Sequence, residues 1–185
     1  MKKALFILTL ALCMVFSDRA QAQRYLPGQR GIQLTTGTIN GSGFHVGAAL
    51  STYTKKANRW TFGGEYLEKR YAYKDLSLPL AQFTAEGGHY FKFLSDGSKT
   101  IFFSLGVSGM AGYETINWNE KLLPDGATIQ SSDAFIFGGA LSLEMETYLT
   151  DGIVLLLNVR ERILGGSSVG KFTTQLGFGL KFIIN

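Results

Sequence analysis

The last stretch of the chain, residues 172–184, carries large apolar side chains on one face and small or polar ones on the other. Its large apolar residues are Phe172, Leu176, Phe178, Leu180, Phe182 and Ile184. Successive side chains of a β-strand point to opposite faces, so this period of two predicts a strand. Most strand-like segments of the chain repeat the pattern. It is typical of a membrane β-barrel, whose strands are apolar toward lipid and polar toward the lumen.

The N-terminus has the features of a secretory signal peptide. Two lysines precede an apolar run from Ala4 to Phe16, and a small-x-small sequence ends at Ala22. This arrangement predicts cleavage after Ala22, leaving a signal peptide of residues 1–22 and a β-barrel domain of residues 23–185. The apolar run is shorter than the roughly 20 residues that a membrane-spanning helix needs. The only cysteine, Cys13, lies in this leader, so we expect no disulfide in the mature chain.

Alternation and turn signals divide the barrel domain into about eight strands. The expected ranges are 30–39, 44–53, 59–70, 78–93, 100–113, 134–149, 153–162 and 172–185, with a polar loop at 71–77. Every second connection is short, and the longest connection is 114–133, as in barrels with short periplasmic turns and long extracellular loops. The predicted fold class is therefore all-β: a small antiparallel outer-membrane β-barrel, preceded by a cleaved signal peptide.

Charged residues on the polar face predict how the lumen is filled. The interior of an eight-stranded barrel is just wide enough for side chains, which is too narrow for DNA. Buried charges must be paired, so we expect an internal ion-pair network of Glu65, Glu86, Glu144, Arg160 and Lys181. Within it, Arg160 is expected to pair directly with Glu144. The alternative is a proton or solute path through the lumen.

The sequence offers little for catalysis. His45 shares a face with Ser51, and Glu65 is on the next strand, but no nucleophile motif surrounds any serine. The two histidines, His45 and His89, give no metal-ligand spacing. We therefore expect no catalytic, cofactor-binding or metal-binding residues and no cofactor; a lipid-modifying outer-membrane enzyme is the alternative.

The longest connection is the predicted interaction site. It combines an aromatic residue with polar groups: Glu114, Asn117, Trp118, Asn119, Glu120 and Asp125. An aromatic anchor among polar side chains suits protein recognition. The alternative is a lid folded over the barrel mouth.

Several stretches carry a family resemblance: 23–31, 62–66, 84–88, 111–117, 123–127 and 146–151. Together they resemble the TraO family of conjugative-transposon transfer proteins of Bacteroides-type bacteria. The resemblance implies an envelope component of a type IV secretion-like mating apparatus, with other envelope transfer proteins as its partners. Combined with the predicted barrel, it makes the expected protein an outer-membrane component in contact with outer-membrane lipid. The family offers no catalytic residues to carry over. Part of the chain's basic charge lies in the leader, so the charge does not indicate nucleic-acid binding, and we expect no direct contact with nucleic acid. The alternative function is a general small porin-like, adhesion or structural barrel unrelated to conjugation.

Overall fold

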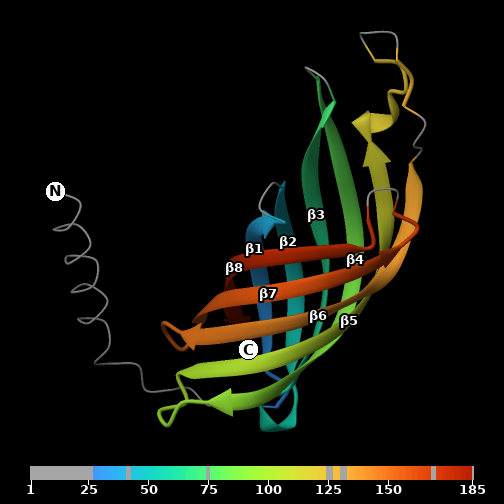
Figure 1. Cartoon of the computed structure of the whole chain (residues 1–185). Helices are drawn as coiled ribbons and strands as arrows, with labels where there is room; N and C mark the ends of the chain where they lie inside the picture. The colour runs from blue at the N-terminus through green and yellow to red at the C-terminus, as the bar shows by residue number, and fades with distance from the viewer. Residues whose placement is uncertain are drawn as a thin grey trace, which may run out of the picture.

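The computed structural model describes residues 27–40, 43–73, 76–123, 127–129, 133–167 and 170–184. In this part of the chain, eight antiparallel strands close into a barrel in chain order (Figure 1). The strands are β1 (Arg30–Ile39), β2 (Gly43–Tyr53), β3 (Arg59–Tyr73), β4 (Leu76–Ser95), β5 (Ile101–Ile116), β6 (Ala134–Tyr148), β7 (Ile153–Gly165) and β8 (Phe172–Ile184). Two short 3-10 helices, η2 (Lys55–Ala57) and η3 (Asn117–Asn119), lie in connections. The predicted barrel of about eight strands is confirmed, whereas the predicted signal peptide lies outside the described residues.

The barrel closes with a large stagger. Neighbouring residues along one path around the wall are Arg30, Thr52, Trp60, His89, Val107, Leu141, Glu161, Thr174 and Asn40. The path returns to β1 ten residues further along than it began. Such a stagger tilts the strands against the barrel axis and leaves a narrow interior that side chains fill.

The two faces of the wall differ as the alternation predicts. Large apolar side chains such as Leu34, Phe62 and Phe137 are exposed on the outside, whereas Ser51 and Glu144 are buried on the inside. The buried part of this protein is therefore its lumen. Among the residues that the structure describes, no helix has the length and apolar character needed to cross a membrane.

The strands extend further than predicted at one end of the barrel. We call this end, which carries the paired ends of β3 and β4 and residues 117–123, the loop end. The opposite end, with the tight connections around residues 55–57, 96–99 and 149–152, is the turn end. β3 and β4 remain paired as far as Tyr73 and Leu76, so the prediction of a polar loop at 71–77 was wrong. The paired ends of β3 and β4 project past the neighbouring strands, with Ala72 and Ser77 exposed and Tyr71 packed against a buried apolar cluster. Pro79 fits this position, because β4 pairs with β5 only from Leu80 onward.

Buried apolar clusters lie toward both ends of the lumen. At the turn end, Phe102, Tyr148, Val154 and Leu156 form one buried cluster. At the loop end, the buried residues are Ile39, Leu67 and Leu80. Most buried charges of the lumen lie between these two clusters, whereas Glu114, opposite Gln82, lies beside the loop-end cluster.

Candidate functional site: a charged lumen and a projecting loop

A first group of charges lies toward the turn end of the lumen. This turn-side cluster consists of Tyr53, Arg59, Glu144, Glu146 and Lys181. Arg59 forms an ion pair with Glu144, and its Nη1 lies 3.2 Å from Oε2 of Glu146. Lys181 pairs with Glu146 and donates a hydrogen bond of 3.0 Å to the Tyr53 hydroxyl. Two cations thus face two carboxylates, and all four side chains are buried.

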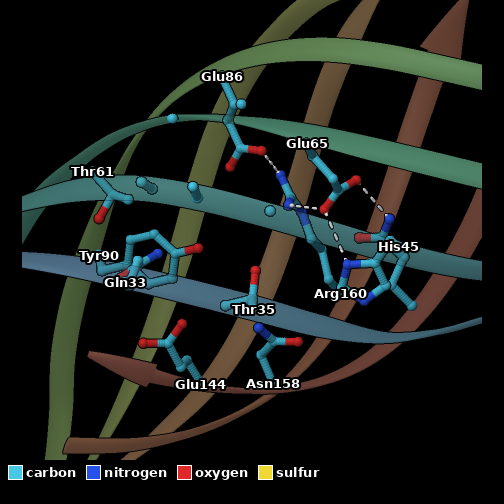
Figure 2. Close-up of a pocket in the computed structure, with 16 residues that line it drawn as sticks. Gln33, Thr35, His45, Thr61, Glu65, Glu86, Tyr90, Glu144, Asn158 and Arg160 are labelled. Carbon is cyan, nitrogen blue, oxygen red and sulfur yellow. Dashed lines mark hydrogen bonds and ion pairs between the residues drawn. The ribbon is translucent and has the colours of Figure 1, made fainter. Parts of the chain in front are cut away.

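A second group of charges lies at the middle of the lumen. This mid-lumen cluster consists of His45, Glu65, Glu86, Arg160, Arg162 and Gln175. Arg160 pairs with Glu86, and its Nη1 lies 3.4 Å from Oε2 of Glu65 (Figure 2). Arg162 Nη1 lies 3.1 Å from Oε1 of Glu65, and His45 Nδ1 lies 3.4 Å from its Oε2. Glu65 on β3 thus contacts side chains of β2 and β7, and Gln175 on β8 donates a further hydrogen bond of 2.9 Å to its carboxylate.

The structure corrects one predicted pair. Arg160 does not contact Glu144: it pairs with Glu86 and Glu65, and Glu144 pairs with Arg59. On the adjacent strands Glu144 lies opposite Asn158, and Arg160 lies opposite Ser142. Because of this stagger, the Arg160 side chain crosses the lumen toward β3 and β4.

Arg59, Glu146 and Arg162 were missing from the predicted network. Each lies two positions from another inward-facing residue on its strand: Thr61, Glu144 and Arg160, respectively. All three lie within the predicted strands 59–70, 134–149 and 153–162, where the period-two pattern already places them on the inward face.

A small cavity lies between the two clusters. Its volume is about 40 Å³, and its lining includes Gln33, Glu65, Glu86, Glu144 and Arg160 (Figure 2). A water needs about 10–15 Å³ of such space, so the cavity holds a few waters at most. The described part of the lumen is therefore packed with side chains, many of them paired charges.

The groups considered for catalysis are separated. Ser51 Oγ donates to Gln33 Oε1 at 3.0 Å, whereas His45 contacts Glu65. Among the described residues, no three or more His, Cys, Asp and Glu side chains are grouped so that they could hold a metal ion.

Glu114 is not part of the predicted interaction loop. β5 continues to Ile116, so Glu114 is a buried lumen residue near the loop end. Its carboxylate accepts hydrogen bonds of 2.7 Å from Gln82 Nε2 and from Ser167 Oγ. Its polarity suggested a loop, but its inward position follows from the strand register.

The remaining predicted loop residues project from the barrel. Asn117, Trp118 and Asn119 form η3, all with positive φ, and Asn117 Nδ2 donates to the Glu120 carbonyl at 2.8 Å. Trp118 is 58% exposed and Leu122 is 72% exposed. Asp125 lies outside the described residues.

The projecting segment is anchored to the barrel at its base. Asp133 accepts a hydrogen bond of 3.1 Å from the Tyr113 hydroxyl and one of 3.3 Å from the Ile116 amide. Leu122 and Thr128 form an isolated antiparallel bridge. In Figure 1 the segment rises beyond the tips of β1 and β2, on the same side as the β3–β4 hairpin.

The closed ladder, the apolar exterior and the filled polar lumen define a class: the small transmembrane β-barrels. Three solved structures share the fold. Neisserial surface protein A has a TM-score of 0.54 and 14% identity, covering 83% of this chain and 94% of its own. The attachment invasion locus protein Ail of Yersinia pestis has a TM-score of 0.53 and 8% identity, and the match covers 86% of this chain and 100% of Ail. The N-terminal barrel domain of Pseudomonas aeruginosa OprF has a TM-score of 0.52 and 10% identity, and the match covers 85% of this chain and 98% of that domain.

The sequence itself identifies the family. Residues 26–184 match the family model of conjugative transposon protein TraO, so the chain belongs to the TraO family. This confirms the family resemblance found in the sequence. No curated protein matches the chain.

Proposed function

We propose that this TraO-family protein is a non-enzymatic outer-membrane component of the apparatus that transfers conjugative DNA between cells. The observation that carries the proposal is the family match over residues 26–184. The fold that the chain shares with proteins such as Ail supports a location in the outer membrane. Other envelope transfer proteins would be its partners.

The filled lumen supports a structural role over that of a conduit. Ion pairs such as Arg59–Glu144 and Arg160–Glu86 cross the interior, and buried apolar clusters lie toward both of its ends. A strand of DNA cannot pass an interior of this width. The barrel therefore anchors surfaces that act outside it, and it needs no direct contact with nucleic acid.

The projecting loop is the surface that we assign to protein recognition. Trp118 and Leu122 are exposed there beside the polar Asn119 and Glu120. Aromatic side chains surrounded by polar groups are common at the centre of interfaces. We propose that this loop contacts another part of the apparatus or the recipient surface.

A general adhesion barrel is the second candidate, since exposed aromatic side chains on a projecting loop also suit attachment to another cell. Deletion of the gene from a donor strain tests both. The proposed function is supported if deletion abolishes DNA transfer, if the full-length chain restores it, and if cell-to-cell attachment is unchanged throughout. Undiminished transfer without the gene would refute it.

A further inference from the structure

Glu161 is a carboxylate on the outward face of β7. Its neighbours along the strand, Arg160 and Arg162, point into the lumen and pair with Glu65. Its partners on adjacent strands are Leu141 on β6 and Thr174 on β8. Thr174 Oγ1 donates a hydrogen bond of 2.6 Å to Glu161 Oε2. The side chain therefore lies outside the barrel wall.

Apolar side chains flank this carboxylate along β7 and on β6. Val159 and Ile163, which precede and follow it on the outward face of β7, are each 48% exposed. Ile163 and its β8 partner Phe172 lie nearer the loop end than Glu161. On β7 and β8, apolar side chains thus continue past Glu161 toward the loop end, and its neighbour Thr174 is bonded to Asn40 in the β1–β2 turn. A charge in this position is costly in lipid, and such residues usually have a partner.

A hollow in the outer surface adjoins Glu161. Its volume is about 510 Å³, and it spans β5 to β8 and β1. Val159 and Leu176, both next to Glu161 and Thr174 on the outward face, contribute to its lining. Most of the lining is apolar, including Leu143, Leu157 and Phe178. A carboxylate above an apolar hollow forms a composite surface.

We propose that this outer face docks a membrane-embedded, apolar segment of another protein that carries a Lys or Arg paired with Glu161. The carboxylate calls for a cation or donor, and an anionic lipid headgroup would be repelled by it. A second copy of this chain is a poor fit. Among the described outward-facing residues of the strands, the Lys and Arg side chains are Arg30 at the turn end and Arg70 on the projecting hairpin, away from the depth of Glu161. Only the choice of partner, a transfer protein, rests on the proposed function.

Photo-cross-linking in donor cells tests the docking face. Benzoyl-phenylalanine replaces Leu176 in the full-length chain, and Phe62 on the far wall is the matched control position. We expect a protein adduct at Leu176 and none at Phe62. Glu161→Gln should reduce the adduct about tenfold, the effect of losing one polar contact in a membrane, whereas Glu161→Asp should retain most of it. The cross-linked peptide should contain Lys or Arg among apolar residues.

Each other outcome has a definite meaning. Equal yield with Glu161→Gln, no protein adduct, or an adduct between two copies of this chain would overturn the proposal. An adduct that needs Glu161 but forms equally without the other transfer genes supports the docking face and counts against the proposed function.

A second measurement separates docking from folding. The purified full-length Glu161→Leu variant in phosphatidylcholine vesicles should unfold at higher urea than the wild type, because a charge leaves the lipid-facing surface. In donor cells the same variant should transfer less DNA. A variant with wild-type transfer would contradict the inference.

Discussion

Arg59 gives the most direct test of the filled lumen. Its guanidinium is fully buried, pairs with Glu144 and Glu146, and lies 4.2 Å from the centroid of the Tyr90 ring. Arg59→Met keeps much of the apolar side chain and removes the charge. The change takes away the ion-pair partner of Glu144 and one cation beside Glu146, and both carboxylates are buried.

The expected loss follows from these contacts. Removing one partner of a buried ion pair costs about 3–5 kcal/mol, since a charge is left uncompensated. Glu144 borders the 40 Å³ cavity, so waters there reduce the cost. We therefore expect about 3 kcal/mol, near the lower limit of that range. The matched control is Arg70→Met: Arg70 pairs with Glu68 at 3.1 Å, its side chain is 71% exposed, and the expected loss is below about 1 kcal/mol.

Urea unfolding of the full-length protein in lipid vesicles measures both variants. A double-mutant cycle with Glu144→Gln should show a coupling of more than about 1 kcal/mol, because the two side chains interact directly. Two results would refute the reasoning: a loss at Arg59 no larger than at Arg70, or additive effects of the Arg59 and Glu144 substitutions. Either result would mean that water screens the charges in the lumen as much as it screens charges on the surface.

Three further predictions concern the exterior, the loop and a turn. Leu34→Arg places a charge in the middle of β1 on the apolar face and should cost about 2–4 kcal/mol in vesicle unfolding; tolerance of this change would contradict the assigned strand register. Replacing residues 117–130 with a short Gly-Asn hairpin should preserve membrane insertion and heat-modifiable gel mobility while transfer frequency falls; failure of the barrel to assemble would favour the lid. At the turn end, the hydrogen bond from Ser98, with further bonds from backbone amides, lowers the pKa of Asp96 below its usual value. The ionised Asp96 therefore stabilises the folded protein above the usual carboxyl pKa, and this stabilisation is lost as the pH falls through the lowered pKa. Asp96→Asn should weaken the dependence of unfolding on acid pH. An unchanged pH profile would count against this role.

The alternation of side chains is local, and for that reason the sequence alone determined much of this fold. Residues two apart on a strand share a face whatever the rest of the chain does. The strand character, the approximate number of strands and the inward position of Glu65, Glu144 and Arg160 follow from that rule. The apolar exterior follows from it as well.

Pairing across the lumen was decided only by the tertiary structure. Arg59 and Glu144 are 85 residues apart and meet because the closed ladder staggers its strands. The same stagger separates Arg160 from Glu144. Strand ends were also beyond local prediction: β3, β4 and β5 extend through polar residues because a paired neighbour continues to bind the backbone. Glu161 shows both effects. Its outward position follows from the local alternation of side chains, whereas the hollow beside it forms only when β5 to β8 and β1 curve into one wall.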